Sequence, residues 1–262
     1  MAKRTILFIH GLWIHASSWA EWMKFFNDNG YETLNPGWPG DLPTVAECRN
    51  NPGSIANKGV KEIAGQYQKI AAGLAELPII IGHSFGGLLT QILMGRGAGA
   101  AGIAIDPAPM KGVWQLPFSA LKASFPVLGN PFNLKKAVSL TFDQFRYGFA
   151  NAIPEDEGKE IFDKWTIPAP ARPLFQAATA SFAGTETQVN TSNTTRGPVL
   201  ITGGGKDHIA PPVLGKASQK KYNSIVVTDF QLFPDRGHSL ILDHGWKDVA
   251  AFSLEWLRKN GF

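Results

Sequence analysis

A glycine- and serine-rich turn between two apolar runs constrains the fold of this chain more than any other feature of its sequence. Ile79-Ile80-Ile81 is followed by Gly82-His83-Ser84-Phe85-Gly86-Gly87 and then by the apolar residues 88–94. The isoleucines favour a buried strand, and the residues after the turn favour a helix. Small residues two positions on either side of Ser84 let strand and helix approach closely, which predicts a sharp, strained turn with a serine at its apex.

Apolar, β-rich runs alternate with helical patterns along the rest of the chain. We expect strands at residues 5–9, 31–34, 79–81, 102–105, 199–202 and 225–230, and helices at 18–30, 60–74 and 246–257. Ser18-Trp19-Ala20-Glu21 has the spacing of a capping box at the start of the first helix. This alternation predicts an α/β fold, with a mostly parallel sheet of about six strands flanked by helices.

The alternation breaks between residues 107 and 196. This segment contains half of the chain's 18 prolines and is rich in aromatic residues. Helical patterns at 135–150 and 155–165 are separated by prolines, which interrupt helices. Such a segment predicts a helical cap with an apolar underside, inserted before the strand at 199–202. We therefore divide the chain into a core (residues 1–106 and 197–262) and a cap (residues 107–196).

Acidic and imidazole side chains follow two later strands. Asp207 comes after Gly203-Gly204-Gly205, and His238 comes after the last expected strand. A nucleophilic serine needs a histidine as base and a carboxylate that orients this base. Because the carboxyl ends of parallel strands meet at one edge of a sheet, we expect Asp207 and His238 to reach Ser84.

The negative oxygen formed by attack on a carbonyl needs N–H donors. Leu12 lies in the segment His10-Gly11-Leu12-Trp13 after the first strand, and Phe85 follows the serine directly. We expect the backbone amides of Leu12 and Phe85 to form an oxyanion hole, with His10 orienting the loop.

Together these segments resemble the α/β-hydrolase fold, and within it the serine esterases and non-haem perhydrolases. The matching segments are His10-Gly11, GHSFGG at 82–87, GGGKDHIAPP at 203–212 and GHS at 237–239. The order Ser84, Asp207, His238 is the nucleophile–acid–base order of that fold. The first β-hairpin usual in the family is absent, because residues 5–9 match the strand before the oxyanion loop.

The resemblance implies a serine hydrolase that cleaves a hydrophobic, uncharged carboxylic ester or lactone through an acyl-enzyme, with no cofactor. The expected substrate contacts are aromatic: Trp13, Trp114, Phe118 and Phe145. Perhydrolases, amidases, C–C hydrolases and hydroxynitrile lyases share the triad, and a ligand receptor that retains the triad without turnover is a further alternative. A lyase would need a lysine from the cap, for which Lys111 and Lys122 are candidates.

Two residues compete for the same roles. Asp106 follows the strand at 102–105 and is a rival for the acid, although Pro107 stiffens the chain after it. His244 is a rival for the base, but it lies on the approach to the last helix. We favour Asp207 because its glycine-rich turn lets a short side chain bend toward a neighbouring loop.

Charge and composition exclude several classes of protein. The net charge is +4, but basic residues are scattered, which argues against a nucleic-acid partner. The histidines lack the spacing of metal ligands on one helix, and a single cysteine, Cys48, excludes an internal disulfide. Apolar runs are shorter than the roughly 20 residues of a membrane span, and the apolar stretch after Arg4 is too short for a signal peptide. We expect a cytoplasmic protein with no membrane partner, and its oligomeric state stays open.

Overall fold

A parallel sheet forms the centre of the protein. The computed structural model describes residues 3–180, 182, 184–223 and 225–262, and within them the main sheet has six strands in the order β2-β1-β3-β4-β7-β8. The strands are β1 (Thr5–Ile9), β2 (Glu32–Leu34), β3 (Ile79–His83), β4 (Ala101–Ile105), β7 (Val199–Gly204) and β8 (Thr228–Phe233). All neighbours in this sheet pair in parallel, which confirms the predicted fold class.

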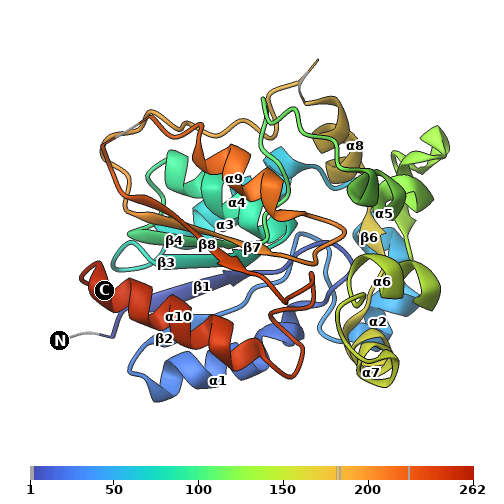
Figure 1. Ribbon diagram of the computed structural model, residues 1–262, viewed down its shortest axis with the longest axis horizontal. Helices are drawn as coiled ribbons and strands as arrows, with labels where there is room; N and C mark the ends of the chain where they lie inside the picture. Colours follow the sequence, from blue (N-terminus) through green and yellow to red (C-terminus); the bar gives the residue numbers. More distant parts are fainter. Residues whose placement is uncertain (1–2, 181, 183, 224) are drawn as a thin grey trace.

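Alternate side chains of the central strands enter two separate cores. Ile80 packs on one side of the sheet and Ile79 and Ile81 on the other, as expected for a strand buried on both faces. Helices α3 (Val60–Ala72), α4 (Phe85–Gly95) and α9 (Pro212–Gln219) cover the first face, and α1 (Ala20–Asp28) and α10 (Trp246–Lys259) cover the second (Figure 1). Among the described residues, no helix has the length and apolar character needed to cross a bilayer.

The segment of residues 107–196 is called the insert below; its helices lie beyond the carboxyl ends of the strands, and its last residues run back past the end of α4 to β7 (Figure 1). It contains α5 (Phe118–Leu128), α6 (Phe142–Gly148), α7 (Glu155–Trp165), α8 (Arg172–Thr179) and a two-stranded antiparallel sheet of β5 (Ala137–Val138) and β6 (Ala169–Pro170). The short helix α2 (Val45–Asn50) also lies at this end of the sheet.

Side chains of Trp13 and Arg49 are among the groups that fasten the insert to the core. The indole Nε1 of Trp13 donates to the carbonyl of Val138 at 3.0 Å. The guanidinium of Arg49 donates to the backbone carbonyls of Phe162, Asp163 and Thr166 at the carboxyl end of α7. The carbonyl of Phe162 also accepts from the amide of Thr166 at 3.2 Å, and a cation at this end complements the helix dipole.

Three local predictions were wrong. The last strand begins at Thr228 because its pairing starts opposite Val199, and the predicted first residue, Ile225, is 95% exposed. Residues 135–150 do not form one helix: β5 pairs with β6, and Thr141 then starts α6 with a capping box of its own. The capping box at Ser18 is not formed, since a 3-10 turn (Ala16–Trp19) precedes α1.

Candidate active site

Ser84 occupies a strained turn between β3 and α4. Its backbone has φ 57° and ψ −120°, a conformation that residues other than glycine rarely adopt. A Cβ atom on Gly82 would lie 2.1 Å from the carbonyl oxygen of Gly86, and one on Gly86 would lie 2.1 Å from that of Ile9. Because both contacts are with backbone, only glycine fits, and the two glycines hold Ser84 at the end of the strand.

Asp207 and His238 form a buried hydrogen-bonded pair beside this turn. The Nδ1 of His238 donates to Oδ2 of Asp207 at 2.6 Å, and both side chains are almost fully buried. The other oxygen, Oδ1, accepts from the amides of Ile209 at 2.7 Å and Ala210 at 2.9 Å. Burial alone would raise the pKa of Asp207, but the charge and hydrogen bond of His238 and its other donors lower this pKa, so the carboxylate is ionised.

His83 links His238 to the Ser84 turn. Its Nε2 donates to the backbone carbonyl of His238 at 3.0 Å, and the two imidazole rings lie 4.5 Å apart. Burial and the neighbouring His238 lower the pKa of His83, which favours a neutral ring. A residue adjacent to Ser84 in sequence therefore holds the loop that carries His238.

Asp106 lies against the same pair. One atom each from Asp106, Asp207 and His238 lies within 4.8 Å of the others. The carboxyl of Asp106 accepts from Oγ1 of Thr202 at 3.1 Å and from the amide of Gly204 at 3.0 Å. Burial, the charge of Asp207 and a hydrogen bond to it hold the pKa of Asp106 well above its ordinary value. The pKa values of the two carboxyl groups thus shift in opposite directions: that of Asp106 is raised and that of Asp207 is lowered.

Leu12 and Phe85, whose backbone amides are the expected oxyanion donors, line the same cavity as Ser84. Among the residues that the structure describes, neither amide donates to a protein acceptor. His10 holds the loop that carries Leu12: its Nε2 donates to Asp41 at 2.8 Å, and its ring stacks on Trp38 at 5.2 Å. The loop therefore presents an unpaired donor next to the serine, and such donors suit a developing oxyanion.

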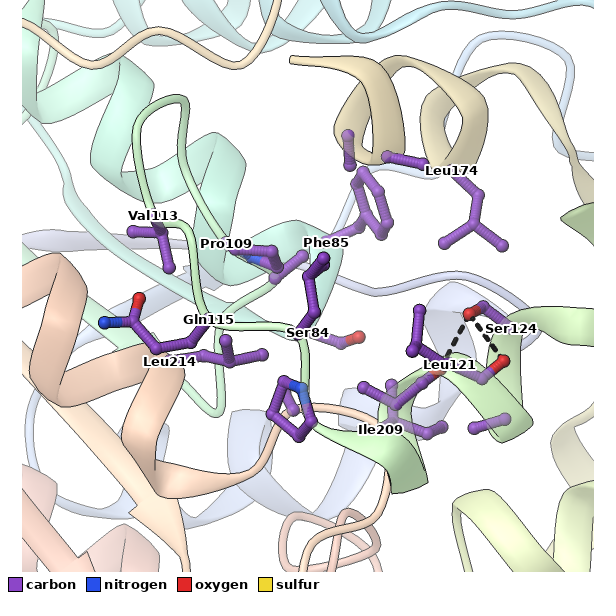
Figure 2. A pocket seen from close by; sticks show the side chains of 18 of the residues that line it. Ser84, Phe85, Pro109, Val113, Gln115, Leu121, Ser124, Leu174, Ile209 and Leu214 are labelled. Carbon is purple, nitrogen blue, oxygen red and sulfur yellow. Dashed lines mark hydrogen bonds between the residues drawn. The ribbon is translucent and has the colours of Figure 1, made fainter. Parts of the chain in front are cut away.

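A cavity of about 170 Å³ opens above Ser84 (Figure 2). Leu121 from α5, Leu174 from α8 and Leu214 from α9 surround the serine in this view. No charged side chain lines the cavity within the described part of the chain; its few polar side chains include Ser124 and Gln115. The site thus combines buried polar groups beneath Ser84 with an apolar chamber above it.

Two of the four expected aromatic contacts line this cavity and two do not. Trp13 and Trp114 are on its wall. Phe145 is instead fully buried in a separate core, stacked on Phe149 at 4.7 Å, because its face of α6 turns toward α7. Phe118 is 79% exposed on the outer face of α5. Neither Phe118 nor Phe145 lines the cavity in this structure, contrary to the placement expected from sequence.

The rival residues lie elsewhere. His244 is exposed and its Nδ1 contacts Glu157 of α7 at 2.9 Å. The ammonium of Lys111 donates to the carbonyl of Gly184, and that of Lys122 lies 4.0 Å from the centre of the Tyr147 ring. Neither lysine lines the cavity, so the feature expected of a lyase is not present among the described lining residues.

Sequence reasoning missed two groups of residues. The contact of Asp106 with Asp207 was not anticipated, because each aspartate was considered as an alternative to the other. Ala120, Ala123 and Ser124, at helical spacing on α5, also line the cavity. Small residues at this spacing are the only signal for them, and they are common on any packed helix face.

Comparison with known proteins supports the family. A model of the alpha/beta hydrolase family matches residues 6–252. A comparison with curated proteins finds no match. Among solved structures, a monoacylglycerol lipase from Paleococcus ferrophilus is 20% identical, with 100% of this chain and 97% of the lipase covered and a TM-score of 0.71.

Two further solved structures are similar. A polyneuridine aldehyde esterase is 14% identical, with a TM-score of 0.67, and a methylesterase from Arabidopsis is 13% identical, with a TM-score of 0.64. Each alignment covers 97% of this chain and 99% of the other. At these identities the likeness shows the fold alone. Since the family model spans nearly the whole sequence, the chain belongs to the alpha/beta hydrolase family.

Proposed function

We propose that this protein is a serine hydrolase that cleaves hydrophobic, uncharged carboxylic esters or lactones. One observation carries the proposal: Ser84, two unpaired backbone amides and an apolar cavity meet beside a buried Asp207–His238 pair. Each part has a defined use in acyl transfer.

The hydrogen bond between Asp207 and His238 determines which ring nitrogen of His238 carries the proton. Because ionised Asp207 accepts from Nδ1, His238 holds its proton there, and Nε2 keeps a free electron pair. We assign Nε2 as the base that removes the proton from Ser84 as its Oγ attacks the carbonyl carbon. Asp207 then stabilises the imidazolium that forms.

The amides of Leu12 and Phe85 receive the negative oxygen of the tetrahedral intermediate. As the intermediate collapses, the C–O bond to the alcohol breaks, and His238 returns its proton to the leaving oxygen. A water deprotonated by His238 then attacks the acyl-enzyme, which releases the acid and regenerates Ser84. We propose that the insert is a cap whose apolar inner face receives the acyl or alcohol group.

The apolar lining supports an uncharged substrate. A carboxylate or ammonium in the cavity would lose hydration without gaining a charged partner from the described lining residues. The similar solved structures are titled a methylesterase, a monoacylglycerol lipase and an esterase of polyneuridine aldehyde. They agree with ester chemistry but differ in substrate, so they leave the choice of ester to experiment.

Labelling with a fluorophosphonate and turnover of p-nitrophenyl esters test the proposal. The Ser84→Ala variant should lose labelling and lower kcat by about a millionfold, as in the best-studied serine hydrolases. Ser124→Ala is the matched control: Ser124 also lines the cavity, but its hydroxyl donates to the carbonyl of Ala120. It should retain labelling and most of kcat.

A panel of lactones, amides, peracid formation and cyanohydrins distinguishes the other chemistries of the triad. Labelling that survives Ser84→Ala would contradict the serine mechanism. Tight binding of an ester by a protein that neither labels nor turns it over would indicate a receptor instead.

A further inference from the structure

The outer face of α5 exposes an apolar stripe. Phe118, Leu121 and Phe125 are spaced at three and four residues, so they lie on one side of the helix. Phe118 is 79% exposed and Phe125 is 70% exposed. Phe132, in the 3-10 turn that follows α5, is 80% exposed. A helix that covers a cavity would ordinarily direct such residues inward, and here they face water.

This stripe is continuous with the cavity above Ser84. Trp114, Leu116, Leu121 and Phe182 line the cavity and are also exposed, and the rings of Trp114 and Phe182 pack edge to face at 5.6 Å. The mouth of the cavity therefore opens within an apolar patch. We define the mouth surface as these four residues together with Phe118, Phe125 and Phe132.

The chain segment that carries six of the seven residues of the mouth surface is basic. Between Asp106 and Asp143 the sequence contains four lysines and no acidic residue. Lys122, Lys135 and Lys136 are exposed beside the aromatic residues. The acidic first turn of α7 lies farther away, because α6 separates α7 from α5 (Figure 1). Exposed Trp, Phe and Leu bordered by lysines are typical of protein surfaces that rest on anionic lipid.

We propose that the mouth surface docks on an anionic lipid surface, with the aromatic side chains in the acyl boundary and the lysines at the headgroups. A second protein chain on this patch would close the cavity, whereas a lipid surface would deliver apolar molecules to it. The sequence expectation of no membrane partner rested on the absence of a spanning segment, which does not bear on a peripheral surface. Docking itself does not depend on the proposed hydrolysis; only the use of the delivered molecule does.

Co-sedimentation with vesicles tests the proposal. Diether phosphatidylcholine, alone or mixed with an equal part of diether phosphatidylglycerol, contains no carboxylic ester, so turnover cannot affect the result. The protein should partition onto the mixed vesicles at least about tenfold more strongly than onto the neutral ones. Raising the salt to about 0.5 M should remove most of this difference, because it screens the lysines.

Three multiple variants separate the contribution of the aromatic residues to vesicle binding from that of the lysines. Phe125→Ser with Phe132→Ser should lower partitioning about tenfold while leaving turnover of a short, water-soluble ester unchanged, since neither residue lines the cavity. Lys122→Gln with Lys135→Gln and Lys136→Gln should abolish the preference for anionic vesicles. Leu77→Ser with Ile225→Ser is the matched control, because these exposed apolar residues precede β3 and β8 at the opposite end of the sheet.

Equal partitioning of the wild type and the Phe125/Phe132 variant would overturn the proposal. A wild-type dimer that ignores vesicles and dissociates on the same substitutions would also overturn it, and would assign the mouth surface to a second copy of this chain. A wild-type protein that binds vesicles but turns over no ester would contradict only the proposed function.

Discussion

The carboxyl edge of the sheet and the insert above it form the two halves of one site, yet they are built by opposite means. At the sheet edge, Asp207 and His238 are buried, and backbone amides or the partner side chain satisfy both oxygens of Asp207 and Nδ1 of His238. In the insert, α5 faces the cavity with alanine, serine and leucine and directs two phenylalanines to water. One half is defined by hydrogen bonds and the other by apolar contact.

This difference separates chemistry from selection. Hydrogen bonds fix Asp207 and His238 in one arrangement, because an unsatisfied buried polar atom is costly. Apolar contact is less directional, so the insert tolerates variation in the size and shape of what it contacts. We therefore expect substitutions at the sheet edge to change the rate for every substrate, and substitutions in the insert to change stability or preference.

After Ser84→Ala, the largest expected effect is that of Asp207→Asn. An asparagine at this position lets the imidazole adopt the wrong tautomer, and kcat should fall by about 10⁴ for all esters, as in the best-studied triad. Asp106→Asn is the matched control, because Asp106 lies against the same pair and an asparagine keeps its size and an oxygen that can accept from Thr202 or Gly204. We expect its kcat to stay within about tenfold of the wild type. Steady-state kinetics at equal folded fraction, checked by circular dichroism, provide the measurement; the reverse ranking would assign the acid to Asp106.

The same division explains what could be predicted from sequence. The strand ends that carry Ser84, Asp207 and His238 follow from local patterns, because the turn glycines have steric reasons visible in the chain itself. The four central strands, β1, β3, β4 and β7, follow from apolar runs that are buried on both faces. The residues that line the cavity cannot be predicted in this way, since the orientation of an insert helix depends on packing between segments far apart in sequence. Phe145 and Phe118 show this: both are aromatic residues of the insert, one buried in its own core and one in water.

Phe145→Ala should have the next largest effect, and on stability rather than preference. Phe145 is fully buried against Phe149 and Phe162, and truncation leaves a cavity that the surroundings fill only partly. The free energy of unfolding should fall by about 3–5 kcal/mol, measured by urea denaturation. Phe118→Ala, at an exposed position, should change it by no more than about 0.5 kcal/mol. A changed ester preference in the Phe145 variant without loss of stability would contradict this interpretation.

The two aspartates predict opposite effects of pH on stability. The pKa of Asp106 is raised in the folded state. Its contribution to the free energy of unfolding is therefore complete below the ordinary carboxyl pKa of about 4 and is lost as pH rises through the pKa of the folded state. Asp207, whose pKa is lowered, contributes above that ordinary value and loses its contribution on acidification. Asp106→Asn should therefore gain stability relative to the wild type as pH rises above about 4, by no more than about 1.4 kcal/mol per pH unit. Urea denaturation of both proteins between about pH 4 and 9 measures the difference; parallel curves would show that Asp106 is ionised in the fold.

The smallest expected effect concerns Trp114, and it tests whether the insert selects substrates at all. Trp114 lines the cavity but is 61% exposed, so an acyl chain reaching it gains only part of the contact that a buried tryptophan would provide. Trp114→Ala should lower kcat/KM for long-chain p-nitrophenyl esters by about threefold to tenfold, because apolar contact discriminates weakly. The acetate ester, which stays near Ser84, should change by less than about twofold. Phe132→Ala, exposed and away from the cavity, serves as control with soluble esters. An equal loss on acetate and long-chain esters would mean that Trp114 supports the sheet edge instead, and the division between chemistry and selection would not hold at the mouth of the cavity.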